Sequence, residues 1–252
     1  MEKLRKPFQG VGNIIRFNWH FYLFAFLFLV VLFVASSYLN ETLRLYCYII
    51  SILVATSTFL SLSVSLYVYD LSGLYNLNWI ENDNTENTIV TINAGFDETT
   101  EIIKSKFPNC NITACDFYDP AKHTEVSLQR ARKAYPSPLN TIQINTDRLP
   151  FADNSFDYTL TIFSAHEIRA EQERIDFFNE LHRVTSVSGE ILVTEHLRDW
   201  NNFFVYTLGF FHFHSRKSWM RTFNQANLKL IREIKSTPFI TTFILTKNGN
   251  TL

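Results

Sequence analysis

Two short stretches of the sequence hold most of the residues that can carry out acid–base chemistry. Residues 164–169 read Ser-Ala-His-Glu-Ile-Arg, and residues 195–199 read Glu-His-Leu-Arg-Asp. Histidine titrates near neutral pH, so it can act as a general base on a phenol, an amine or an acid, with a neighbouring glutamate to orient it. The candidate catalytic residues are therefore His166, Glu167, Arg169, Glu195 and His196.

The elements around these stretches are expected to bring them together. Each stretch follows an apolar run, 158–163 or 191–193, typical of a strand buried on both faces of a parallel sheet. Between the runs, apolar side chains recur at helical spacing up to Val184, and residues 186–189, which end in glycine, predict a turn. Because parallel strands end at one edge of a sheet, the charged residues of both stretches, with Arg198 and Asp199, are expected to converge on one crevice.

Two other interpretations of these residues stay open. Glu167 with Arg169, and Glu195 with Arg198, could be ion pairs that only fix the loops, since structural ion pairs cluster in the same way. His212-Phe-His214 raises the question of a metal site shared with His166 and His196. A His-x-His pair on a strand shares a face, but no recognised spacing ties it to the other histidines, so no metal is predicted.

Three segments carry a resemblance to a known family. They are Leu-Pro-Phe-Ala-Asp-Asn-Ser-Phe-Asp at 149–157, Glu-Leu-His-Arg-Val at 180–184 and Gly-Glu-Ile-Leu-Val at 189–193. Together they resemble the core of class I methyltransferases that depend on S-adenosylmethionine (SAM), most closely the subgroup that includes quinone-biosynthesis enzymes. The resemblance covers roughly residues 88–247. It implies an α/β, Rossmann-like sheet that is mostly parallel, with its last strand antiparallel, and SAM as the cofactor.

The resemblance also implies which residues bind the cofactor. The family's first turn lets its backbone approach the methionine part of SAM and usually has two or three glycines, whereas this chain has Gly95 alone. Asp116 ends the second predicted strand, where the family places an acid on the ribose hydroxyls; the alternative is a turn residue that only ends the strand. The expected cofactor contacts are Asn93, Ala94, Gly95 and Phe96 in the first turn, Asp116 and Phe117, Asn145 and Thr146 near the adenine, and Ser164.

The N-terminal part of the chain lies outside the family pattern and reads as a membrane hairpin. No charged residue occurs between Arg16 and Glu41 or between Arg44 and Asp70, and a span needs about 20 residues. Two transmembrane helices explain these runs better than a cleaved signal peptide, whose apolar part is shorter, or than two helices buried in a soluble core. Basic residues precede the first run, so the N-terminus and the C-terminal domain are both expected to face the cytoplasm.

These signals divide the chain into four parts. Residues 1–16 are expected to be a cytoplasmic N-terminus, 17–70 a two-helix transmembrane hairpin, 71–87 a juxtamembrane segment and linker, and 88–252 the methyltransferase-like domain. The aromatic segment around 200–219 could be a lid or membrane-facing flap over the methyl acceptor, or a plain packing helix.

Composition narrows the function further. The formal net charge is −1 and no long basic stretch is present, which argues against nucleic acid as a partner. The first turn lacks G-x-G-x-x-G, which disfavours a nicotinamide-dependent oxidoreductase. The sequence thus predicts a multi-pass membrane protein whose methyltransferase domain acts on an amphipathic or lipid-like small molecule, such as a quinone, a phenol or a lipid headgroup. The alternative is a catalytically degenerate domain that serves as a membrane scaffold or binding module.

Overall fold

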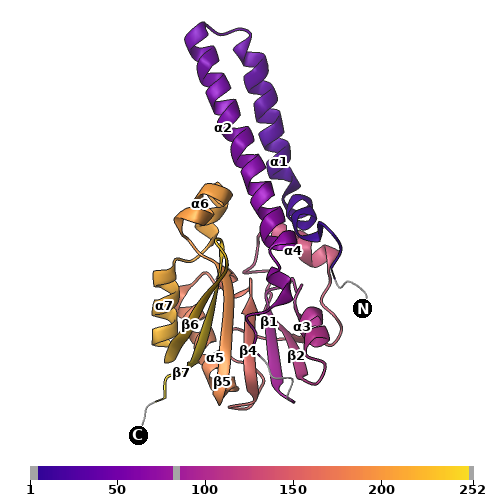
Figure 1. Ribbon diagram of the computed structural model, residues 1–252, viewed down its shortest axis with the longest axis vertical. Helices are drawn as coiled ribbons and strands as arrows, with labels where there is room; N and C mark the ends of the chain where they lie inside the picture. The colour runs from indigo at the N-terminus through magenta and orange to yellow at the C-terminus, as the bar shows by residue number, and fades with distance from the viewer. Residues whose placement is uncertain (1–4, 82–85, 250–252) are drawn as a thin grey trace.

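The computed structural model describes residues 5–81 and 86–249, which form an α/β domain with a long helical hairpin above it (Figure 1). Seven strands make one sheet in the order β3-β2-β1-β4-β5-β7-β6. The first five strands pair in parallel, and the last strand, β7, runs antiparallel to both of its neighbours. The fold class expected from the sequence is therefore confirmed. The strands are β1 (Thr88–Asn93), β2 (Asn111–Asp116), β3 (Ile142–Gln143), β4 (Phe156–Ile162), β5 (Thr185–His196), β6 (Leu228–Thr237) and β7 (Ile240–Lys247).

Helices connect the strands and cover both faces of the sheet. The crossover helix between β4 and β5, which the sequence predicted from its apolar spacing, is α5. Short 3₁₀ turns follow β4 and α6 and lie at the carboxyl edge of the sheet, where the candidate catalytic residues are found. The helices of the domain are α3 (Thr100–Lys106), α4 (Val126–Ala134), η3 (Ala165–Glu167), α5 (Glu171–Val184), α6 (Trp200–Tyr206), η4 (Thr207–His212) and α7 (Arg216–Gln225).

The core has one layer on each side of the sheet, because successive strand residues point to opposite faces. On one side, Val193 and Phe243 pack against Phe178 of α5 and Trp219 of α7. On the other side, Leu192 packs with α3 and with residues 77–80, which precede the part of the chain that is not described. The segment expected as a juxtamembrane linker therefore supplies core residues in its described part.

One predicted boundary differs from the structure. Residues 186–189 were expected as a turn, but β5 begins at Thr185, directly after α5, and its pairing with β4 shifts register between Phe156 and Tyr158. A side chain at Gly189 would come within 2.7 Å of the carbonyl oxygen of Asp157, so glycine is needed for this close approach rather than for a turn. The third strand is only two residues long and lies exposed at the sheet edge.

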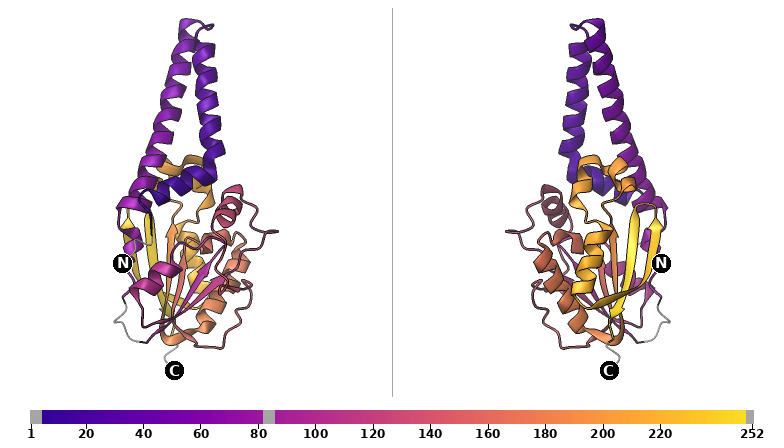
Figure 2. Two further views of the ribbon diagram at one scale, coloured as in Figure 1. Left: turned by 90° about the vertical axis from the view of Figure 1, so that its right-hand side faces the viewer. Right: turned by 90° about the vertical axis from the view of Figure 1, so that its left-hand side faces the viewer.

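The hairpin consists of α1 (Gln9–Ser36) and α2 (Glu41–Leu66), which extend away from the carboxyl ends of the parallel strands (Figures 1 and 2). Asn40 begins α2 by accepting a hydrogen bond from the backbone N–H of Leu43 at 3.0 Å. Helix α1 bends at Asn18, whose backbone is not helical, so residues 9–17 lie across the domain while the rest of α1 leaves it. Both helices are long and apolar enough to cross a membrane, by length and composition.

Candidate active site

The turn after β1 holds its single glycine in a left-handed conformation against the ring of Tyr118. Gly95 has φ +88°, and a Cβ at this position would lie 2.8 Å from the ring of Tyr118. Asn93 holds the turn: its side-chain oxygen accepts the Gly95 N–H at 3.1 Å, and its Nδ2 donates to the carbonyl of Cys115 at 2.8 Å. Of the other two turn residues, Ala94 is buried, and the ring of Phe96 packs edge-on against Phe17 of α1. The left-handed backbone and the close approach of Tyr118 therefore both require glycine at position 95.

Asp116 lies beside this turn, because β1 and β2 pair in a register that sets Asn93 opposite Asp116. The carboxylate is 1% exposed, and its own chain already engages both oxygens. Oδ1 accepts the Tyr118 N–H at 2.8 Å, while Oδ2 accepts the Ser137 hydroxyl at 3.0 Å and forms an ion pair with Arg132. The acid is thus in the expected place, but two ribose hydroxyls can bind it in a bidentate manner only after Oδ2 is released.

Because Arg132 and a ribose hydroxyl would compete for Oδ2 of Asp116, removing Arg132 is expected to change the affinity for SAM. The guanidinium is 30% exposed but the carboxylate is only 1% exposed, so water screens one end of the pair, and its attraction is worth at least about 1 kcal/mol, a factor of roughly five in affinity. We expect Arg132→Ala to tighten SAM binding by at least about fivefold, measured by calorimetric titration of the detergent-solubilised full-length chain. Lys133→Ala, on the same helix, is the matched control and should leave the affinity unchanged; weaker binding in Arg132→Ala would mean that Arg132 helps to hold the cofactor.

Residues expected near the adenine lie together at the ends of β2 and β3. Phe117, Asn145 and Thr146 line a cleft of ≈ 340 Å³, which continues to Lys122 and Glu173. Thr146 donates to Glu173 at 2.7 Å, and the buried Phe117 ring packs on Phe177. This cleft leaves room for a ligand on the adenine side. Ser164 is different: it is buried, and its hydroxyl donates to the carbonyl of Ile92 at 2.7 Å, so it ties the end of β4 to β1.

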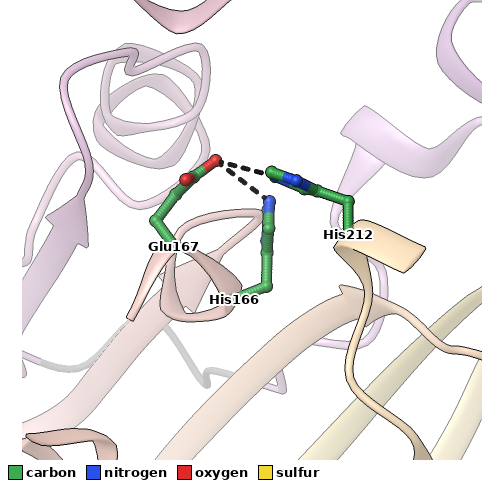
Figure 3. A group of neighbouring side chains, drawn as sticks. All are labelled: His166, Glu167 and His212. Carbon is green, nitrogen blue, oxygen red and sulfur yellow. Dashed lines mark hydrogen bonds and ion pairs between the residues drawn. The ribbon is translucent and has the colours of Figure 1, made fainter. Parts of the chain in front are cut away.

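His166 and Glu195 form a buried pair at the carboxyl ends of β4 and β5. The Nδ1 of His166 lies 2.6 Å from Oε2 of Glu195, and its backbone N–H donates to Oε1 at 3.1 Å. The other ring nitrogen, Nε2, lies 3.3 Å from Glu167 (Figure 3). Burial alone would lower the pKa of His166, but the two carboxylates outweigh burial and raise the pKa to about 10. The imidazole is therefore held between two acids, with no nitrogen free to act as a base.

His196 faces a different part of the domain. Its Nε2 lies 2.6 Å from the hydroxyl of Tyr69, its Nδ1 lies 3.0 Å from Oδ1 of Asn202, and its ring stacks on Phe213. Burial lowers the pKa of His196 to about 4, so the ring is neutral at physiological pH. His196 thus joins the hairpin base to α6, and it would have to give up a partner before it could take a proton.

The expected convergence of seven charged residues occurs only in part. His166, Glu167, Arg169 and Glu195 do lie together, and Arg169 is 3.7 Å from Glu167, as the ion-pair interpretation had it. No Glu195–Arg198 pair is found among the described residues: Arg198 donates to a backbone carbonyl in η4, and Asp199 caps α6. The other charged residues of the two stretches therefore fix loops.

Two further residues, Glu125 and His212, lie close to Glu167 and Arg169, and of these the sequence pattern indicated only His212. Glu125 precedes α4, and His212 ends η4, yet the Nδ1 of His212 lies 2.6 Å from Glu125. The Nε2 of His212 lies 3.4 Å from Glu167, which brings a second histidine to the same carboxylate as His166. Only the pattern His-x-His pointed toward His212, and nothing in the sequence places residues 125, 167 and 212 side by side.

Comparisons with known proteins bear on the fold and on residues 91–193. Residues 91–193 match the family model described as a methyltransferase domain. A search of curated proteins found no match. Among solved structures, the PH0226 protein from Pyrococcus horikoshii OT3 is 14% identical, with 72% of this chain and 91% of that chain covered and a TM-score of 0.51.

Two further solved structures have the same fold. An S-adenosylmethionine-dependent methyltransferase from Clostridium acetobutylicum is 10% identical, covering 71% of this chain and 91% of that one, with a TM-score of 0.50. An O-methyltransferase family 2 protein from Planctomyces limnophilus, in complex with apigenin, is 13% identical. The match covers 76% of this chain and 61% of that chain, with a TM-score of 0.51. The structures support the fold, and the match to a methyltransferase domain model covers residues 91–193 of the α/β domain.

Proposed function

We propose that this chain, an enzyme whose SAM-dependent methyltransferase domain follows an N-terminal helical hairpin, is anchored in a membrane by that hairpin and methylates a lipid-like small molecule. A quinone, a phenol or a lipid headgroup would suit this role. When bound, SAM supplies an electrophilic methyl group, and the chain's own residues hold the cofactor and align the acceptor. The first turn and Asp116 would hold SAM, and His166, Glu167, Arg169 and Glu195 would line the acceptor side.

The observation that carries this proposal is that the base of the hairpin is built onto the turn of the cofactor site. Glu98, three residues after Gly95, accepts hydrogen bonds from Arg5 at 2.9 Å and from Asn13 of α1 at 3.2 Å. Asp70, just after α2, accepts the backbone N–H groups of Gly10 and Val11 at 2.8 Å each. An acceptor dissolved in the bilayer would therefore reach the crevice beside the hairpin.

The surface of the hairpin supports the membrane part of the proposal. Phe24, Phe33 and Phe59 are 63%, 71% and 74% exposed, and little of either helix is buried within the chain. Such extended apolar faces are unfavourable in water but match the hydrocarbon of a bilayer. Helix α6 lies beside the hairpin base (Figure 1), and its exposed Trp200 and Phe204 suit the interface between headgroups and acyl chains.

Orientation can be tested by cysteine accessibility in intact cells. In a background without native cysteines, we expect Glu41→Cys, at the tip of the hairpin, to react with an impermeant maleimide from outside. Lys229→Cys, exposed on β6, should react only after the membrane is opened. The reverse pattern would place the methyltransferase domain away from cytoplasmic SAM and would contradict the proposed topology.

A degenerate domain that serves as a membrane scaffold is the second candidate. The pairing of Asp116 with Arg132 and Ser137 favours it, because this pairing occupies the place of the ribose. Transfer of labelled methyl groups separates the two functions: full-length protein in nanodiscs is given methyl-labelled SAM and a panel of hydroxylated quinones, long-chain phenols and phospholipids. Label in the organic phase, absent with Asp116→Ala, supports the enzyme; a folded protein that neither binds SAM nor transfers label supports the scaffold.

A further inference from the structure

Three side chains at the carboxyl edge of the sheet point toward one another from two separate 3₁₀ turns (Figure 3). His166 and Glu167 come from η3, and His212 ends η4. One ligand atom from each lies within 4.8 Å of the other two. The Nε2 atoms of His166 and His212 approach the same oxygen, Oε1 of Glu167, at 3.3 and 3.4 Å.

These separations fit the first coordination shell of a metal ion. A tetrahedral ion with bonds of about 2.1 Å holds its ligand atoms roughly 3.4 Å apart. Two histidines and one glutamate leave a fourth position open, as in catalytic zinc sites. Nitrogen and carboxylate ligands in this combination suit Zn²⁺ and related divalent transition metals rather than Mg²⁺ or Ca²⁺.

A second, independent feature is the pair of carboxylates behind the histidines. The Nδ1 of His166 lies 2.6 Å from Glu195, a fully buried residue of β5, and the Nδ1 of His212 lies 2.6 Å from Glu125. A histidine that donates its Nδ1–H to an acid turns its Nε2 lone pair the other way, which is the usual support behind metal-binding histidines. Both imidazoles are therefore oriented with Nε2 toward the shared oxygen of Glu167.

The negative charge of the surrounding acids also favours a bound cation. Glu125, Glu167 and Glu195 bring three negative charges, and within residues 5–81 and 86–249 the one guanidinium paired with this group is that of Arg169, which contacts Glu125 and Glu167. A divalent cation that takes the place of the proton on His166 adds positive charge to this acidic group. Since Glu195 and Glu167 have little access to water, an unbalanced charge here is costly.

We propose that His166, Glu167 and His212 bind one divalent transition-metal ion of the Zn²⁺ class, with Glu195 and Glu125 orienting the two histidines. The site lies next to the cofactor turn, because Ser164 ties the start of η3 to the end of β1. Arg169 now lies against His212, Glu125 and Glu167, and its 41% exposed side chain swings away when the ion enters.

If the chain is a methyltransferase as proposed, the open fourth coordination position of the metal ion can bind the methyl acceptor. An acceptor hydroxyl that binds the ion loses its proton to solvent, because the metal stabilises the oxyanion. The oxygen lone pair then forms the new C–O bond as the C–S bond of SAM breaks, and the sulfonium becomes the neutral thioether of S-adenosylhomocysteine. The acceptor is therefore an oxygen nucleophile, a phenol or hydroxyquinone rather than an amine.

Metal titration of the full-length protein tests the site without any substrate. Detergent-solubilised protein, freed of metal with a chelator, is titrated with ZnCl₂ in a calorimeter and with CoCl₂ in a spectrometer. We expect one equivalent to bind, with the intense visible absorption of four-coordinate Co²⁺. His166→Ala, His212→Ala and Glu167→Gln should each weaken binding at least about 100-fold, and Glu195→Gln about 10- to 100-fold.

Two variants make the test specific. His182→Ala, on α5 and outside the cluster, is the matched control and should bind like wild type, whereas Arg169→Ala should bind more tightly because the competing guanidinium is gone. The proposal is overturned if folded wild type, with normal near-ultraviolet circular dichroism, takes up no stoichiometric metal, or if His166→Ala and His212→Ala leave binding unchanged.

Turnover separates this proposal from the methyltransferase function. Stripped wild type that regains methyl transfer only with added metal supports the catalytic role. Full activity after stripping overturns that role and leaves the proposed function standing. Stoichiometric metal binding in a protein that transfers no methyl group to any acceptor supports the site and counts against the proposed function.

Discussion

Asp116→Ala is expected to weaken SAM binding by at least about 100-fold while leaving the domain folded. The carboxylate is 1% exposed and lies beside the first turn, in register with Asn93. Hydrogen bonds to a charged group are worth about 1.5–3 kcal/mol each, so losing two ribose contacts costs roughly 3–6 kcal/mol, of which the lost pairing with Arg132 returns a part. Calorimetric titration of SAM and S-adenosylhomocysteine into full-length protein measures the effect.

A double variant shows whether Arg132 acts through this acid. If Arg132 only competes with the ribose for Oδ2, Arg132→Ala tightens binding in wild type but changes nothing in the Asp116→Ala background. Asp153→Ala, an exposed acid paired with Arg183, is the matched control and should bind SAM normally. Equal affinity in Asp116→Ala and wild type would place the ribose elsewhere and remove the main support for the predicted cofactor site.

The sheet could be predicted because its signals are local. The apolar runs of β1, β2 and β4 and the helical spacing of α5 are visible in the sequence, and each corresponds to an element of the structure. The start of β5 was missed because Gly189 reads as a turn residue, whereas the structure uses it to bring β5 close to the backbone of Asp157. Close approach between strands is a tertiary property that a single segment does not encode.

From the sequence, only the residues at the ends of the neighbouring strands β4 and β5 could be predicted to lie together. Glu195 and His196 are consecutive residues of β5, and consecutive strand residues point to opposite faces. Glu195 therefore reaches His166, while His196 reaches Tyr69 of the hairpin base. The alternation of side chains along a strand would have been enough to predict that Glu195 and His196 lie on opposite faces of the sheet. By contrast, the approach of His212 to Glu167 depends on how η4 folds back over η3, which no pattern in the sequence indicates.

Arg174 is the residue whose loss is expected to cost the domain the most stability. The helical spacing placed Arg174 on the apolar face of α5, and the structure buries it to 2% exposure between α5 and α7. Its guanidinium donates to the carbonyl of Ile168 at 3.1 Å and to the hydroxyls of Thr222 and Ser218 at 3.2 and 3.1 Å. One side chain thus fixes the end of the η3 loop, which carries His166 and Glu167, onto α7.

We expect Arg174→Met to lower the free energy of unfolding by about 3–5 kcal/mol, because methionine fills the space but leaves buried hydrogen-bond acceptors without a donor. For a domain of this size that is a fall in melting temperature of roughly 6–20 °C, measurable by thermal unfolding in detergent. Arg221→Met is the matched control: Arg221 also joins α7 to α5, through Glu171, but it is 55% exposed, so its loss should cost less than about 1 kcal/mol.

The comparison of these two arginines also tests what holds the candidate site in place. If the contact of Arg174 with Ile168 positions η3, Arg174→Met should weaken Zn²⁺ binding at temperatures where the protein is still folded, and Arg221→Met should not. Equal stability and equal metal affinity in the two variants would mean that the contacts of Ser164 with β1 and of His166 with Glu195 hold η3 without Arg174. A large loss of stability with unchanged metal affinity would mean that Arg174 holds α7 in place but does not set the geometry of the metal site.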